Sequence, residues 1–143
     1  MKIVDVMRSR GTTDVVTVQP TQTVTELLSV LAEHGIGAVV VSADGASVDG
    51  IVSERDIVRK LNERGAGVLE APVSDIMTTD VHTCTGEDAL EQVAVLMTHQ
   101  RVRHLPVLRS EGLYSIVSIG DVVKFRIEQL QAERDHLVDY INK

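Results

Sequence analysis

Aromatic residues and cysteine are scarce in this chain of 143 residues. There is no tryptophan, and the aromatic residues are Tyr114, Phe125 and Tyr140. Exposed rings are the usual stacking platform for single-stranded nucleic acids, so a bound nucleobase would instead have to lie between aliphatic side chains. The single cysteine, Cys84, excludes an intrachain disulfide framework and suits a reducing compartment.

Positive charge is also in short supply, because 14 Lys and Arg residues stand against 21 Asp and Glu residues, for a net charge of −7. A nucleic-acid-binding protein would present a basic face to the phosphates, so this balance argues against a nucleic-acid partner. No apolar run approaches the roughly 18 residues that span a bilayer. The acidic Asp5 interrupts the N-terminal segment at once, so this segment does not have the pattern of a signal peptide. We therefore expect a cytoplasmic protein with no membrane partner.

Motifs of known catalytic sites are missing as well. The sequence contains no GxSxG, P-loop or GxGxxG motif, and no pair of carboxylates is spaced for acid–base chemistry. The five histidines lack metal-ligand spacing, and no HExxH pair occurs. Cys84 has no activating partner in the sequence and is expected in the core. These absences predict a protein that is not an enzyme and needs no metal.

What the chain does contain is a repeat. Residues 50–58, GIVSERDIV, recur in the second half as 115–123, SIVSIGDVV, and Asp5-Val6-Met7 recurs as Asp75-Ile76-Met77. A helical face with apolar residues at i, i+3, i+4 and i+7 is also present twice. It consists of Val24, Leu27, Leu28 and Leu31 in the first half, and of Leu90, Val93, Ala94 and Met97 in the second. The pattern indicates a structural duplication.

Each half is predicted to follow the order strand, helix, strand, strand, helix, which gives an α/β (α+β) fold. The predicted strands are 15–18, 38–42, 48–53, 81–84, 105–109 and 113–118. Two of the predicted helices begin with capping boxes, Thr23–Glu26 and Asp88–Glu91. The other two begin at Glu54 and at Ile119, and the first helix ends at Gly35. The resulting boundaries are repeats 1–64 and 73–126, a linker at 65–72 and a helical extension at 127–143.

The last helix is predicted to run to about residue 142, roughly twice the length of its counterpart in the first half. Ile127, Leu130, Leu137 and Ile141 have heptad spacing, with Arg134 at the position between. Two interpretations stay open. The helix could cover its own core, or it could be a dimerisation tail.

The duplicated Ser-x-x-Asp motif is the main candidate for chemistry. Ser53 with Asp56, and Ser118 with Asp121, lie where an apolar strand gives way to a helix. The unpaired donors at such a helix start favour anions, and a first-turn carboxylate can accept hydrogen bonds from both hydroxyls of a ribose. The same pattern is also that of an ordinary capping box, so either interpretation fits one copy alone.

Two basic residues, Arg103 and His104, precede the predicted strand at 105–109 and could reach phosphate oxygens. The equivalent segment of the first half, Ile36-Gly37-Ala38, has no base, although Arg55 could partly compensate. The two candidate sites are therefore expected to be unequal, with the Asp121 site the more positive. The alternative is that Arg103 and His104 belong to a solvated loop.

The duplicated order of Asp-x-Met, apolar helix, Leu-Pro-Val and Gly-Ile-Val-Ser-x-x-Asp resembles the cystathionine-β-synthase (CBS) domain, here as a tandem pair, or Bateman module. The resemblance covers about residues 2–125. It implies two β-α-β-β-α repeats packed about a pseudo-twofold axis, with two clefts that bind AMP, ADP, ATP or S-adenosylmethionine. The sequence departs from the family pattern at two positions. Ser115 stands in the second repeat where the first has Gly50, and Val40 stands in the first repeat where the second has Pro106.

Carried over residue by residue, the resemblance assigns Ser53, Asp56, Ser118 and Asp121 to the riboses and Arg103 and His104 to phosphate. It assigns Val18, Ile36, Gly37, Val81, Thr83 and Val102 to the base pockets. The function expected from it is a non-enzymatic regulatory module without a required cofactor, associated as a homodimer and acting on a protein target. The alternative is a stress-response or protein-interaction module whose clefts are vestigial and empty.

Overall fold

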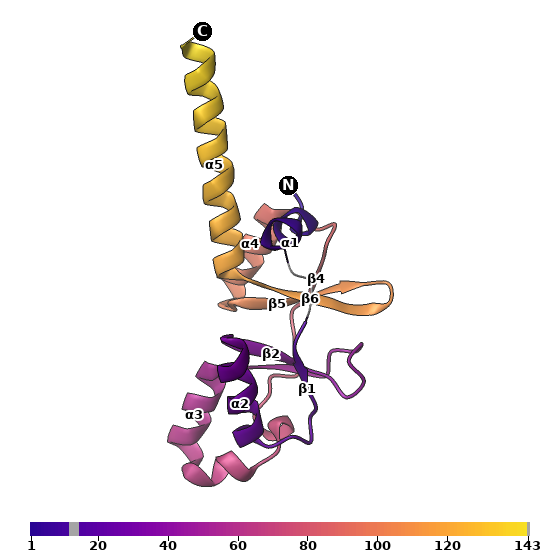
Figure 1. Cartoon of the computed structure of the whole chain (residues 1–143). Coiled ribbons are helices and arrows are strands. Elements are labelled where there is room, and N and C mark those ends of the chain that lie inside the picture. Colours follow the sequence, from indigo (N-terminus) through magenta and orange to yellow (C-terminus); the bar gives the residue numbers. More distant parts are fainter. Residues whose placement is uncertain (12–14, 143) are drawn as a thin grey trace.

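The computed structural model describes residues 1–11 and 15–142, so residues 12–14 of the first repeat and the last residue of the predicted extension lie outside the described part. Two three-stranded sheets form two stacked halves (Figure 1). In the first sheet β1 (Thr17–Val18) pairs parallel with β2 (Ala38–Val41), which pairs antiparallel with β3 (Gly50–Ser53). In the second sheet β4 (Cys84–Thr85), β5 (His104–Arg109) and β6 (Gly112–Ser118) repeat this arrangement. The predicted fold class and pseudo-twofold duplication are confirmed.

The helices that follow the strands also repeat. They are α2 (Val24–His34) and α3 (Glu54–Arg64) in the first half, and α4 (Leu90–Gln100) and α5 (Ile119–Ile141) in the second. The Thr23 half of the predicted capping box of α2 is confirmed, because Thr23 Oγ1 accepts a hydrogen bond from the backbone N–H of Glu26 at 3.1 Å. The Glu26 carboxylate instead accepts from the Gln22 side chain. Gly35 ends α2 in the left-handed conformation, at φ +61°, as expected for a helix C-cap.

Several sequence-based boundaries differ from the structure. The predicted strand 15–18 shortens to β1, and the predicted strand 81–84 is replaced by β4, which keeps Cys84 and adds Thr85, because only these residues pair with the central strands. The other four strands differ from the prediction by one or two residues at an end. The predicted capping box at Asp88 is wrong. The N-cap of α4 is Ala89 without a side-chain cap, and the Asp88 carboxylate instead accepts the backbone N–H of Thr85 at 2.8 Å.

Each half is completed by a segment that precedes the other half in sequence. Helix α1 (Ile3–Arg10) packs its buried Ile3, Val6 and Met7 into the core of the second half. The segment after α3, with the short 3₁₀ helices at Ala66–Glu70 and Val73–Asp75, packs into the core of the first half. The backbone ties are equivalent, since Ile3 N–H donates to Asp88 O and Val73 N–H donates to Gln22 O.

Helix α5 extends well beyond the body of the molecule (Figure 1). Its early residue Val122 is buried and Phe125 packs against the second core. The heptad residues are exposed by 50% at Ile127, 47% at Leu130, 60% at Leu137 and 77% at Ile141. The interpretation that these residues cover the chain's own core is therefore wrong. Over residues 1–11 and 15–142, no helix is long and apolar enough to cross a bilayer.

Candidate functional site

Both Ser-x-x-Asp motifs form reciprocal capping boxes at the starts of α3 and α5. In the first, Asp56 Oδ2 accepts the backbone N–H of Ser53 at 2.8 Å and its hydroxyl at 3.0 Å, while Ser53 Oγ accepts the N–H of Asp56. In the second, Asp121 Oδ2 accepts the N–H of Ser118 at 3.0 Å. The capping interpretation is confirmed for both copies. Oδ1 of each aspartate accepts no hydrogen bond from any described residue, so an acceptor remains for a ligand.

The two copies differ in an arginine that the sequence did not single out. Arg10, at the end of α1, donates from Nη1 to Asp121 Oδ2 at 3.0 Å and to Ile116 O at 2.7 Å. Its Nη2 donates to Ser115 Oγ at 2.7 Å. The Arg10 side chain is three-quarters buried, at 24% exposure, and its Nε is buried without a partner in the described residues. Helix α1, which packs on the second half, therefore supplies a counter-ion to Asp121.

The exchange of Gly50 for Ser115 has a packing explanation. A Cβ at Gly50 would lie 2.7 Å from Met77 Sδ and 2.9 Å from Thr78 O, so only glycine fits at this strand start. In the second half the equivalent position is fully buried but accommodates Ser115, whose hydroxyl pairs with Arg10. The second repeat therefore differs from the first by a hydrogen-bonded pair, Ser115 with Arg10, where the first has Gly50.

The start of each central strand is hydrogen-bonded to the start of a helix. Glu54 N–H donates to Gly37 O at 2.9 Å, and Ile119 N–H donates to Arg103 O at 2.8 Å. Gly37 and Arg103 are therefore equivalent positions beside the two capping boxes. This arrangement brings together the predicted ribose and phosphate residues of the second repeat.

A cavity of about 410 Å³ lies at this place. It is lined by Arg55, Met97, Thr98, Arg101, Val102, Arg103 and Ile119. Among the predicted site residues, it joins Arg55 of the first repeat to Val102 and Arg103 of the second. The cavity thus has walls from both repeats, with three guanidinium groups among its lining residues.

His104, the first residue of β5, is partly buried and is not among the residues that line the cavity. Burial lowers its pKa below the ordinary 6.5, and the positive charge of Arg103 acts in the same direction. The carboxylates of Asp121 and Glu54 oppose this shift. His104 therefore favours the neutral imidazole near neutral pH and adds little positive charge of its own to the site.

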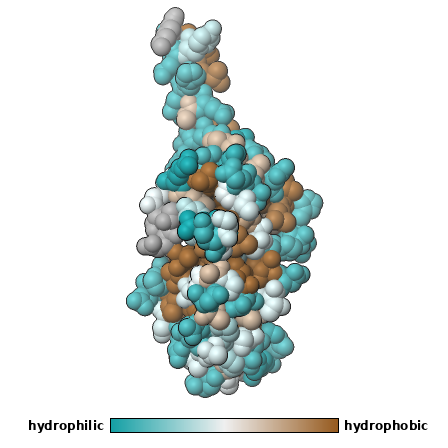
Figure 2. Space-filling view, turned by 90° about the vertical axis from the view of Figure 1, so that its right-hand side faces the viewer, coloured by the Kyte–Doolittle hydropathy of each residue, from teal (hydrophilic) through white to brown (hydrophobic). Residues whose placement is uncertain are grey.

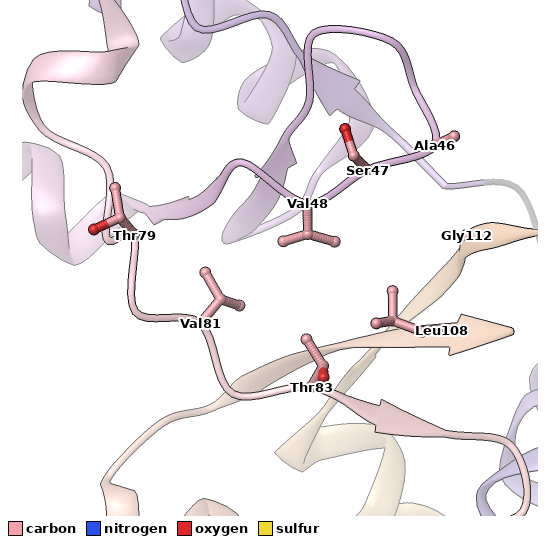
Figure 3. A pocket seen from close by; sticks show the side chains of 8 residues that line it. All are labelled: Ala46, Ser47, Val48, Thr79, Val81, Thr83, Leu108 and Gly112. Atoms are coloured by element: carbon pink, nitrogen blue, oxygen red, sulfur yellow. The ribbon is translucent and has the colours of Figure 1, made fainter. Parts of the chain in front are cut away.

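A second cavity, of about 350 Å³, lies between the β2–β3 loop of the first half and the second sheet. The side chains of Val48, Val81, Thr83 and Leu108 extend into the space between the halves (Figure 3). Two of these, Val81 and Thr83, were predicted for a base pocket. Apolar surface also gathers across the waist of the body in the space-filling view (Figure 2).

The remaining predicted base-pocket residues line neither cavity. Val18 is 1% exposed in the core of the first half, so only its backbone could face a ligand. Ile36 packs against the same core, and Gly37 lies beside the Glu54 carboxylate. In the described residues, no three His, Cys, Asp or Glu side chains are grouped as they would be around a metal ion.

Cys84 lies in the core, as expected, at 4% exposure. Burial, with a smaller contribution from Asp88, raises the pKa of its thiol to about 12. A thiol held protonated in this way is a poor nucleophile.

Comparison with known proteins gives a consistent result. The model of the CBS domain matches residues 3–63 and 73–128. The CBS domain-containing protein CBSX3, mitochondrial, of Arabidopsis thaliana is 35% identical over 153 aligned positions, which cover 97% of this chain and 71% of that protein.

Solved structures show the same likeness. The CBS-domain containing protein ATU1752 from Agrobacterium tumefaciens is 40% identical, with a TM-score of 0.83 over 88% of this chain and 99% of that one. The CBS domain pair of protein MJ0100, solved in complex with 5′-methylthioadenosine and S-adenosylmethionine, has a TM-score of 0.79 at 18% identity, over 90% of this chain and 98% of that one. At that identity the likeness concerns the fold alone.

Proposed function

Because the chain belongs to the CBS domain family and carries two copies of the domain in tandem, we propose that it is a regulatory module that binds adenosine ligands between its repeats. The observation that carries this proposal is the cavity at the starts of α3 and α5, which has residues of both repeats in its wall. The bound adenosine ligands of the MJ0100 pair support it, since they occur on the same fold.

The proposed division of labour follows from the chemistry of the lining and of the two capping boxes beside it. Asp56 and Asp121 are not among the lining residues, but their capping boxes open the two helices at the cavity, and each would offer a carboxylate oxygen to ribose hydroxyls. Arg55 and Arg103, which do line the cavity, would offer guanidinium groups to phosphate. At this cavity adenine would lie against the aliphatic side chains of Val102 and Ile119, because the chain has few aromatic rings.

The module would act without catalysis, by changing the relative arrangement of its repeats. A ligand that contacts both halves favours the arrangement of the repeats in which both sets of contacts are made. It shifts the equilibrium between two arrangements only as far as its affinities for them differ. We propose that the shift is passed to a protein target through a homodimer. Val58 on α3 and Val123 on α5, at equivalent repeat positions, are exposed by 64% and 49% and offer an apolar contact.

The proposal is tested by a thermal-shift screen of the full chain with AMP, ADP, ATP and S-adenosylmethionine. A ligand at 100 times its Kd stabilises the folded state by about 2.7 kcal/mol, which is several degrees in melting temperature for a domain of this size. At least one of the four is expected to give such a shift. An unchanged melting temperature with all four at millimolar concentration would reject the proposal.

A second candidate, a protein-interaction module with empty clefts, is favoured by one observation, the exposed apolar residues along α5. It predicts that the chain shortened after Arg126 loses its partner while the body still folds. Pull-down with the full and shortened chains compares the two candidates, because nucleotide binding in the cleft does not require residues 127–142.

A further inference from the structure

Three arginines with different positions in the fold line the cavity at the helix starts. Arg55 is on the first turn of α3, Arg101 ends α4, and Arg103 precedes β5. Within residues 1–11 and 15–142, none of the three forms a salt bridge or donates a side-chain hydrogen bond. The chain as a whole carries a net charge of −7, so the cavity is locally positive in a protein that is negative overall.

Arg101 holds its place in spite of its backbone conformation. Its φ is +54°, and among the described residues it is the one non-glycine residue with positive φ. Gly35, the equivalent residue of the first repeat, ends α2 at φ +61° with the same pattern of capping hydrogen bonds. Glycine would be the less strained choice, and the exposed Arg101 side chain adds nothing to the core. The strain is explained if the guanidinium serves the cavity.

The nearby carboxylates compensate only part of this positive charge. Asp121 pairs with Arg10, whereas Asp56, bonded to the neutral Ser53, keeps its negative charge. Glu54, which lies beside Gly37, is the remaining negative group close to His104. The three guanidinium groups therefore outnumber the free negative charge at the cavity.

Charge then separates the possible adenosine ligands. S-adenosylmethionine carries a sulfonium cation, which three arginines would repel. A monophosphate carries a charge of about −2, and every further phosphate adds negative charge and oxygens that guanidinium groups can bind in pairs. We infer that this cavity selects an adenine nucleotide with two or more phosphates over AMP and S-adenosylmethionine. The inference rests on the proposed function, because it concerns the same site.

The test is titration calorimetry of the full chain with ATP, ADP, AMP and S-adenosylmethionine, at one ionic strength and with EDTA to keep the phosphates free of metal. ATP and ADP are expected to bind more tightly than AMP, with S-adenosylmethionine weakest. Arg101→Gln, which keeps the backbone strain and removes the charge, is expected to weaken ATP about tenfold and AMP much less. Arg59→Gln makes the same charge change one turn along α3 from Arg55, outside the lining of the cavity, and should weaken ATP much less than Arg101→Gln does.

The possible outcomes separate this inference from the function on which it rests. AMP or S-adenosylmethionine binding as tightly as ATP overturns the inference and leaves an adenosine-binding module. Equal losses for Arg101→Gln and Arg59→Gln overturn the selective role of Arg101. Failure of all four ligands to bind overturns the proposed function and the inference together. Arg101→Gly, which relieves the strain, verifies that any loss comes from the missing charge, since it should weaken ATP to the same extent as Arg101→Gln.

Discussion

At the scale of single residues, the two aspartates of the repeated motif have unequal surroundings. Asp56 bonds only to Ser53 among the described residues, whereas Asp121 also pairs with the mostly buried Arg10. Removal of one partner from a pair that is largely out of water leaves the other charge poorly solvated. The second capping box should therefore contribute more to folding stability than the first.

Asp121→Ala is expected to lower the free energy of unfolding by about 2–3 kcal/mol, since it removes the Asp121 half of the capping box and leaves Arg10 without its counter-ion. Asp56→Ala, the matched change in the first repeat, removes only the Asp56 half of its capping box and should cost about 1 kcal/mol. Urea denaturation measures both. Equal losses would show that the Arg10–Asp121 pair adds no net stability, and Arg10→Ala in each background would then complete a double-mutant cycle.

His104 gives the protein a pH dependence of known sign. Its pKa is lowered in the folded state, chiefly by burial, so below about pH 6.5 the unfolded chain takes up a proton that the folded chain does not. Stability should fall as pH drops through this value, and the contribution of His104 should level off below its folded-state pKa. Urea midpoints at about pH 7.5 and about pH 5.5 should therefore differ less in His104→Gln than in the parent chain. The exposed His99→Gln is the control, and an undiminished pH effect in His104→Gln would contradict the assignment.

The residue-level predictions from sequence were limited by long-range contacts. The Ser-x-x-Asp pattern is local, so both capping boxes could be recognised from the sequence. The contact of Arg10 with Asp121 joins residues 111 positions apart, and nothing in the pattern near either residue points to it. Arg101 could have been found, because alignment of the repeats places it opposite Gly35, the end of a helix.

At the scale of elements, α5 is the part of the fold that a single chain leaves uncovered. Its heptad residues are half or more exposed at Ile127, Leu137 and Ile141. Arg134 lies among them and, within the described part of the chain, pairs only with the neighbouring Asp135. A charged residue in a heptad seam lowers the stability of self-association. If the seam contacts a second copy of the chain, replacement of Arg134 by leucine should strengthen the dimer.

Arg134→Leu is expected to tighten self-association about tenfold or more, since it adds apolar surface to the seam. Glu128→Leu adds comparable apolar surface one position beyond Ile127, outside the heptad positions, and serves as the matched control. Sedimentation equilibrium over a range of concentrations measures both. A gain shared equally by the two variants would show non-specific association, and no gain in either would reject α5 as a dimer contact.

Helices were predicted from the sequence more accurately than short strands. The apolar periodicity and the Gly35 stop located α2 because both signals are local. Helix α1, which packs into the core of the second half, was not predicted. The two-residue strands β1 and β4 have their limits set by pairing with β2 and β5, which no local pattern records. Asp88 failed as a cap for a similar reason. The chain pairs here with the residues that precede α1, since Ala89 lies opposite Lys2 and Leu90 N–H bonds to Met1 O.

At the scale of the whole molecule, the exchange of segments ties the two halves into one unit. Helix α1 completes the second core, and residues 66–76 complete the first. The cavity at the helix starts belongs to neither half alone, since Arg55 comes from one and Arg103 from the other. A ligand bound there would therefore report on, and alter, the relation between the halves.

The most direct test of this account is an amide NMR titration of the full chain with ATP. The account predicts saturable shift changes that group at the first turns of α3 and α5 and at residues 101–104, on both sides of the boundary between the repeats. Changes confined to one repeat or to the exposed part of α5, or a spectrum that does not change at millimolar ATP, would contradict it.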